Sequence, residues 1–302
     1  MSKPFNYGGQ AVMEGVMMRG SQTMAVAVRD PHGQIVMHTE ALNEALYRGP
    51  LGRLPFVRGL TMLWDALGLG IRGLMFSANV AVGEDEDVSF EGPLMWGTVI
   101  ASLALGVGLF FLLPKLAAAL FERLFHSSLA GLLVEGVVRL LLFVGYVWLI
   151  GHMPDIRRVF AYHGAEHKTI NAYEAGAPMT VEGVRPFGTA HARCGTAFLL
   201  TLVILSILVF APLARLPLGW GLAARVMLIP VLAMLAYEVL RFSSKHIHWA
   251  WVKVMVAPNL ALQRLTTREP DDSMIEVAIA ALKRVLDDEG VRSESLRIRS
   301  EP

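Results

Sequence analysis

Charged residues are scarce in this sequence. They make up 18% of the 302 residues, whereas 54% are apolar, and the mean hydropathy is +0.49. This composition is too apolar for an ordinary soluble domain of this length. The net charge is only +1, and no segment has a basic face, which argues against a nucleic-acid partner. We therefore expect a membrane protein whose partners are the lipid bilayer and either further copies of itself or other membrane proteins.

Three common features are missing. Cys194 is the single cysteine, which excludes an internal disulfide and predicts a reduced thiol. The glycine-rich stretch 8–20 matches neither of the usual phosphate-binding glycine patterns, so nucleotide binding is not expected. The polar start of the chain lacks the basic and apolar regions of a signal peptide. We expect the first 90 or so residues to belong to the mature protein.

Long apolar runs are what the sequence does contain. Four of them approach the roughly 20 residues that cross a bilayer as a helix. They cover residues 93–119, 129–151, 196–214 and 220–240. The sequence therefore predicts a mainly α, polytopic membrane protein with about four transmembrane helices.

The distribution of Lys and Arg predicts the orientation. Seven lie before the first run, five in the loop 152–195 and ten from Arg241 onward, whereas the other two loops contain only Lys115, Arg123 and Arg215. Basic residues accumulate on the cytoplasmic side of membrane proteins. Both termini and the loop 152–195 are therefore expected in the cytoplasm.

We expect four regions along the chain. The first region, residues 1–92, is expected to be small, α+β and cytoplasmic. It contains a β-hairpin formed by 23–29 and 34–40 and an apolar helix over 54–82. This helix either lies in the membrane interface or packs on the membrane domain. Residues 93–241 form the transmembrane domain. In the helical region 242–290, Ser273 and Glu276 match a capping box that opens a helix to about residue 288. The polar tail 291–302 is expected to be disordered.

A helix is predicted from Pro154 to Ala175, and it carries the pattern His163-x-x-Glu166-His167. Residues i, i+3 and i+4 share one helix face, so both imidazoles can reach one metal ion while the carboxylate lies beside them. The inverted-zincin metalloproteases use this pattern with the glutamate as general base. His163 and His167 are thus candidate ligands and Glu166 a candidate catalytic base.

Three further residues offer a third ligand. Glu174 continues the helix face of the two histidines, and His191 and Cys194 lie just before the third apolar run. Imidazole, thiolate and carboxylate ligands favour a divalent transition metal, with zinc the leading choice. The alternative is that the histidines are buried and hydrogen-bonded to carboxylates without binding a metal.

Charged residues also occur within the apolar runs, where burial is costly. Glu135 and Arg139 lie four residues apart in the second run, and Arg225 lies in the fourth. We interpret Glu135 and Arg139 as an internal ion pair that orients the helices. The alternative is a polar pathway for an ion or a substrate.

Four motifs in order, spread over nearly the whole chain, resemble the YqhQ-like bacterial membrane proteins. They cover residues 8–20, 162–169, 191–196 and 265–270. That family has no known function and is commonly labelled as predicted metal-dependent enzymes. The resemblance implies a location in the bacterial cell (inner) membrane and a site shared with the family.

The leading hypothesis is metal-assisted hydrolysis of a carbonyl or phosphoryl group at the cytoplasmic face, with Glu166 as the base. A metal-dependent hydrolase is thus one expectation. A non-catalytic assembly or scaffold protein is the second, and a transporter or channel component that uses the charged residues of the spans is the third.

Overall fold

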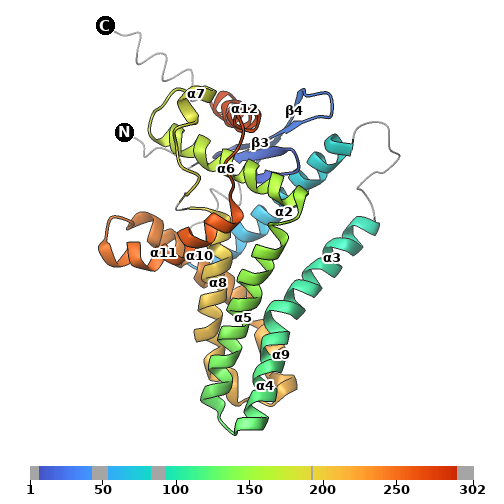
Figure 1. Ribbon diagram of the computed structural model, residues 1–302, viewed down its shortest axis with the longest axis vertical. Coiled ribbons are helices and arrows are strands. Elements are labelled where there is room, and N and C mark those ends of the chain that lie inside the picture. Colours follow the sequence, from blue (N-terminus) through green and yellow to red (C-terminus); the bar gives the residue numbers. More distant parts are fainter. Residues whose placement is uncertain (1–6, 43–53, 83–92, 192, 291–302) are drawn as a thin grey trace.

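The computed structural model describes residues 7–42, 54–82, 93–191 and 193–290. Figure 1 shows two parts stacked along the long axis, a β-sheet covered by helices at one end and an elongated helical bundle at the other. The expected tail 291–302 lies outside the described residues.

The sheet has four antiparallel strands in the order β1-β2-β3-β4. These are β1 (Gly8–Val12), β2 (Gly15–Arg19), β3 (Thr23–Arg29) and β4 (Ile35–Ala41). The predicted hairpin is present as β3 and β4, with Thr23 opposite Ala41 and Arg29 opposite Ile35. The glycine-rich stretch was not predicted as strands, but it forms a second hairpin that turns at Glu14, whose φ is 49°.

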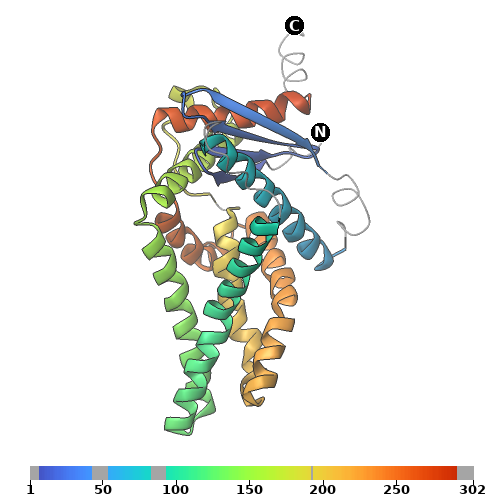
Figure 2. The same ribbon diagram turned by 90° about the vertical axis from the view of Figure 1, so that its right-hand side faces the viewer.

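Helices cover both faces of this sheet. Side chains alternate between the two faces of a strand: Met18 and Ala25 pack with α6 (Pro154–Glu174) and α12 (Asp272–Asp288), whereas Met17 and Met24 pack with α2 (Val57–Val82). Figure 2 shows the sheet between α12 and α2. The sheet thus braces α6, the helix that carries the His-x-x-Glu-His pattern.

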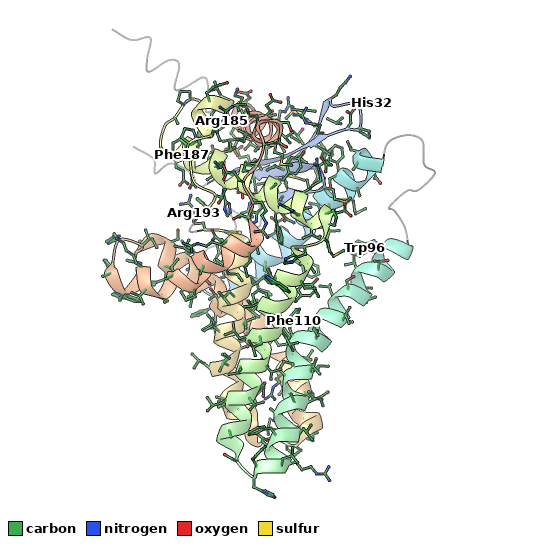
Figure 3. All side chains as sticks on the ribbon, viewed as in Figure 1. His32, Trp96, Phe110, Arg185, Phe187 and Arg193 are labelled. Atoms are coloured by element: carbon green, nitrogen blue, oxygen red, sulfur yellow. The ribbon has the colours of Figure 1, made fainter. Side chains whose placement is uncertain are left out.

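Among the described residues, three helices are long and apolar enough to cross a membrane. They span Trp96–Phe125, Ala130–Ile150 and Gly195–Leu213. The first runs through α3 (Pro93–Val107), the π-helical turn η1 (Gly108–Leu112) and α4 (Leu113–Phe125), and the others are α5 (Ser128–Ile150) and α8 (Gly195–Phe210) with the 3-10 turn η2 (Ala211–Arg215). Their apolar side chains point outward along the bundle (Figure 3), and Leu105 is 72% exposed. Such a surface suits apolar surroundings.

The fourth expected span is not one straight helix. It is divided into α9 (Leu218–Met227) and α10 (Ile229–Lys245), which meet at an angle of 44°. Pro230 lies in the first turn of α10 and has no backbone N–H to continue the hydrogen bonds of α9. The described residues therefore contain three candidate spans, or four if the bent pair counts as one.

The C-terminal region contains more structure than the single helix expected from its capping pattern. The helix α11 (Ala250–Thr266) precedes α12 and lies across the direction of α5 and α8 (Figure 1). The predicted capping box is also wrong in detail, because Asp271, not Ser273, is the N-cap of α12 and accepts a hydrogen bond from the N–H of Met274. A short helix α7 (Val181–Val184) lies between α6 and α8.

Candidate metal centre

Helix α6 is pressed against the segment that joins α11 to α12. A Cβ added to Gly164 would lie 2.0 Å from the carbonyl oxygen of Arg268, and the N–H of Arg268 donates to the carbonyl of Phe160 at 2.8 Å. Only glycine allows this approach. The contact brings the backbone around Thr266 to the side of His163.

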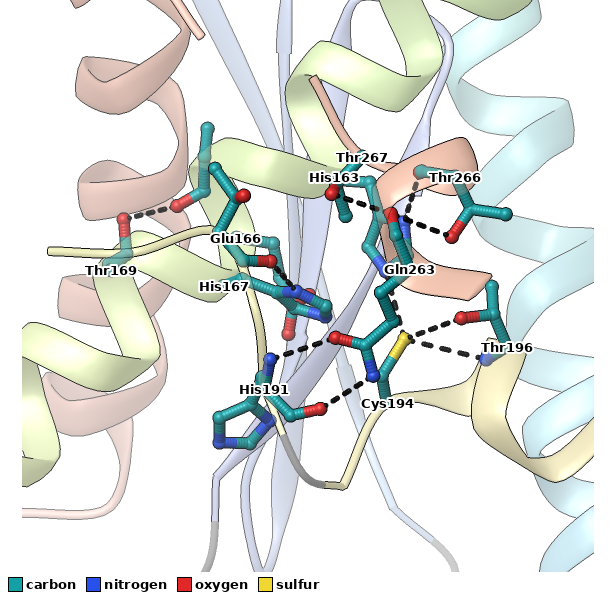
Figure 4. A network of polar contacts seen from close by, with 12 residues as sticks. His163, Glu166, His167, Thr169, His191, Cys194, Thr196, Gln263, Thr266 and Thr267 are labelled. Atoms are coloured by element: carbon teal, nitrogen blue, oxygen red, sulfur yellow. Dashed lines mark hydrogen bonds and ion pairs between the residues drawn. The ribbon is translucent and has the colours of Figure 1, made fainter. Parts of the chain in front are cut away.

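Three candidate ligands meet at this place. The ligand atoms of His163, His167 and Cys194 all lie within 4.8 Å of one another, and Figure 4 shows the three side chains with their neighbours. His163 Nε2 lies 3.1 Å from Cys194 Sγ, and the two imidazole rings are 4.4 Å apart. Cys194 is the N-cap residue of α8, so the cluster lies where a candidate membrane span begins.

Backbone carbonyls fix the protons of both imidazoles. His163 Nδ1 lies 2.8 Å from the carbonyl oxygen of Thr266, and His167 Nδ1 lies 2.5 Å from that of Thr189. A carbonyl oxygen can only accept, so each Nδ1 donates and each Nε2 is directed into the cluster. Metal-binding histidines are usually held in this way.

Glu166 adds a carboxylate to the same buried space. It is 4% exposed, and its Oε2 lies 3.4 Å from His167 Nε2. Glu166 is also close to the sheet, because a Cβ on Gly9 would lie 2.9 Å from its Cγ. His167 Nε2 and Glu166 Oε2 are thus two buried acceptors that face each other. Burying them costs free energy unless a positive charge, either a proton or a metal ion, satisfies both.

The pKa of His167 reflects this arrangement. Burial lowers the pKa of its imidazole, but the Glu166 carboxylate and the Cys194 sulfur raise it more, so the net shift is upward. The surroundings of His167 therefore favour its protonated form despite its burial.

Two predicted ligands lie outside the group. Glu174 forms an ion pair with Arg193 and lies 3.7 Å from His191 Nε2. The His191 ring lies 5.6 Å from that of His167 and is directed away from Cys194 (Figure 4), and burial lowers the pKa of His191. Glu174 is seven residues beyond His167, about 10.5 Å along a helix, which is too far to share one ion. Of the three alternatives for a third ligand, Cys194 is the one that lies with His163 and His167.

Sequence reasoning did not find the residues that position the cluster. Gln263 is 1% exposed, and its side-chain amide accepts from the N–H of His191 at 2.9 Å and donates to the carbonyl of His191 at 2.8 Å. It thus fixes the loop that supplies Thr189 and Cys194. Gln263 lies outside the motif 265–270, and although Thr266 lies within that motif, a motif does not reveal which backbone carbonyl turns inward.

A second buried polar cluster lies inside the bundle. Glu135 accepts from Arg139 at 2.7 Å and from Arg225 at 2.9 and 2.7 Å. The remaining guanidinium nitrogens donate to Ser206 and to the carbonyls of Phe110 and Gly221. The expected pair of Glu135 and Arg139 is therefore present, and Arg225 joins it. Phe110 belongs to η1, so the π-helical turn supplies one acceptor.

The fold and the cluster together define a class of protein: a helical chain with candidate membrane spans and a buried His, Cys and carboxylate site where one span begins. The chain matches the family described as "Protein of unknown function (DUF1385)" over residues 54–288, and it belongs to that family. It is 35% identical over 295 residues, 94% of this chain and 93% of the relative, to "Uncharacterized protein YqhQ" of Bacillus subtilis (strain 168). Neither description names a metal or an activity. No solved structure matches the chain.

Proposed function

We propose that this protein is a multi-pass protein of the bacterial inner membrane, with its termini and the His163 cluster on the cytoplasmic side. The three apolar helices support the membrane location. The excess of Lys and Arg before the first span, in residues 152–195 and after residue 241 supports the orientation.

We further propose that His163, His167 and Cys194 bind one zinc ion. The observation that carries this proposal is the convergence of acceptors: two Nε2 atoms directed inward by backbone carbonyls, one sulfur, and a carboxylate at 3.4 Å. Ligand atoms around tetrahedral zinc lie about 3.3 to 3.8 Å apart, given bonds of about 2.0 to 2.3 Å. Small side-chain rotations bring the three atoms to these separations. Two nitrogens and a sulfur favour zinc over the hard cations magnesium and calcium.

The chemistry that this site supports is hydrolysis of a carbonyl or phosphoryl group. Zinc with three protein ligands supplies a Lewis acid and brings the pKa of a water molecule to about 7. Glu166 is the base, because its carboxylate borders the ligands and can accept a proton there. His191 and the ion pair of Glu174 with Arg193 flank the cluster without joining it.

The first test measures metal content in the full-length protein purified in detergent without chelators. We expect about one zinc per chain, and less than about a tenth of that in the double variant His163→Ala/His167→Ala or in Cys194→Ser. His191→Ala is the matched control, since it removes a neighbouring buried imidazole outside the group, and it should retain the metal. Stable wild-type protein that does not bind added zinc would contradict the proposal.

The second test separates binding from catalysis. Glu166→Gln removes the base but keeps the three ligands. With zinc loaded, we expect turnover of a model ester, amide or phosphoester to fall about 10²- to 10⁴-fold while the zinc content is unchanged. If Glu166→Gln and the wild type hydrolyse these compounds at equal rates, Glu166 is not the base.

A further inference from the structure

A surface cavity of about 590 Å³ lies beside the first turns of α6, within the size range of small-molecule sites. Its lining joins three segments of the chain: the end of α5, the start of α6 and the connection between α11 and α12. The lining residues are His152, Pro154, Arg157, Arg158, Ala161, Arg268, Glu269 and Met274. It lies on another face of α6 from the metal cluster, because residues 157, 158 and 161 are offset from 163 and 167 on the helix.

Some of the charged side chains that line this cavity have ion-pair partners and others do not. Arg158 binds both oxygens of Glu14, at 2.6 and 2.5 Å, and Glu269 forms an ion pair with Lys168. The side chain of Arg157 is exposed and has no hydrogen-bond or ion-pair partner among the residues that the structure describes. The guanidinium of Arg268 contacts only backbone carbonyls, through Nη1. Two guanidinium groups are therefore left with donors for a ligand.

The start of α6 adds to the positive potential. Met153 occupies the N-cap position and provides no side-chain hydrogen bond. Pro154 has no N–H, so the N–H groups of Asp155 and Ile156 are the ones that keep their capacity to bind an anion. Asp155, in the first turn of the helix, is the nearby acid that opposes this charge, but it does not line the cavity.

The cavity lies next to the end of α5, and this position along the helical bundle indicates what binds there. His152 follows the end of α5 by two residues and packs on Trp148, with ring centroids 4.6 Å apart. Trp148 is 56% exposed, and exposed tryptophans at the ends of spans mark the head-group region of a bilayer. In the membrane location proposed above, the cavity would lie at the level of the lipid phosphates.

We propose that this cavity binds a phosphate group, supplied by the head group of an anionic phospholipid, between Arg157 and Arg268. Guanidinium groups match phosphate through paired hydrogen bonds, and basic pockets beside transmembrane helices bind lipid head groups. The proposal rests on the membrane location proposed above but not on the metal site.

The test uses full-length, delipidated protein in a neutral detergent. The melting temperature is followed while phosphatidylglycerol, phosphatidylcholine or inorganic phosphate is added. We expect saturable stabilisation by phosphatidylglycerol and none by phosphatidylcholine. Arg157→Gln and Arg268→Gln should each require about tenfold more phosphatidylglycerol for half of the effect.

Two further variants make the result specific. Arg123→Gln removes an exposed arginine from the last turn of α4, beyond the far end of α5, and should bind the lipid as the wild type does. Arg157→Lys keeps the charge but loses the planar fork, and we expect intermediate binding. Equal lipid response in Arg157→Gln and Arg123→Gln would overturn the site. An equal response to inorganic phosphate in the wild type would overturn the lipid as the source of the phosphate.

Discussion

The protein has two buried polar clusters that differ in how their charges are matched. Around Glu135, each guanidinium nitrogen of Arg139 and Arg225 has an acceptor, and each carboxylate oxygen accepts. Around His163, the thiol of Cys194 can donate to His163 Nε2, but His167 Nε2 and the Glu166 carboxylate face each other as two acceptors. One cluster is complete within the protein, and the other requires a positive charge.

This difference distinguishes a cluster that is complete within the protein from one that leaves acceptors for a proton or a cation. Both clusters contain ionisable residues, and all of the residues named are buried except His163, which is partly exposed. A matched cluster stabilises one arrangement of the helices, and its arrangement gives no support to the transport hypothesis. A cluster with unmatched acceptors needs either a proton or a bound cation between them.

The largest effect is expected from breaking the matched cluster. Glu135→Ala leaves two arginines buried among apolar side chains, so we expect a loss of about 3 to 5 kcal/mol of stability. The measurement is thermal unfolding of the purified protein in detergent. The triple variant Glu135→Leu/Arg139→Met/Arg225→Leu should recover most of this loss of stability, since no charge is then left unpaired. A loss as small as that of an exposed ion pair, about 1 kcal/mol or less, would show that the cluster is not as tightly matched as its distances indicate.

A substitution beside the unmatched cluster is expected to lower the affinity for zinc more than it lowers the stability of the protein. Gln263→Ala removes both hydrogen bonds to the backbone of His191 while it keeps every ligand. Supporting residues of this kind contribute about 10- to 100-fold to metal affinity. We therefore expect zinc to bind about 10-fold more weakly in a competition titration, still at one ion per chain. Asn259→Ala is the control, because Asn259 is one turn earlier on α11 and contacts Thr201, away from the loop. An equal loss of affinity in both variants would attribute the effect to α11 as a whole.

The smallest loss of stability is expected at the N-cap of α12, Asp271, which lies outside both clusters. Burial raises the pKa of Asp271, but hydrogen bonds from Ser273 and Met274 lower it more, so the pKa of Asp271 is below its usual value. The N-cap contact therefore stabilises α12 above the unfolded pKa, about 3.9, and this contribution is lost as the pH falls through the folded pKa. Asp271→Ala should cost about 1 kcal/mol at neutral pH. Thermal unfolding at neutral pH and near pH 3 tests this, because the difference from the wild type should shrink in acid. A difference that does not change with pH would rule out the carboxylate as its source.

The sequence was most informative where one local pattern decides the structure. Apolar runs predicted the three long helices, and two β-type runs separated by the turn residues Asp30 to Gly33 predicted the β3–β4 hairpin. The first hairpin was missed because glycine has low strand propensity, although its strands are fixed by the core that they enter. The break in the fourth span was marked by Pro230, but the apolar composition continues across it.

The residues of the candidate site likewise fall into those that a local pattern predicted and those that it did not. Spacing on one helix correctly placed His163, Glu166 and His167 together, because helical geometry determines their separation. The choice between Glu174, His191 and Cys194 depended on tertiary structure, and so did the carbonyls of Thr266 and Thr189, which have no signature in the residue type. Sequence alone therefore found the first half of the cluster and only a set of alternatives for the rest.

The contact between Gly164 and Arg268 has a consequence for biosynthesis. Thr266, which orients His163, follows it by 103 residues, and α8, α9, α10 and α11 lie between the two. A ribosome must therefore complete all of these helices before the carbonyl that directs His163 Nε2 can reach its place. The cluster can be assembled only after the last apolar segment has been synthesised and folded back against α6. A partly synthesised chain therefore carries both histidines without the backbone that orients them, and the zinc site proposed above would be completed only once this last segment is in place.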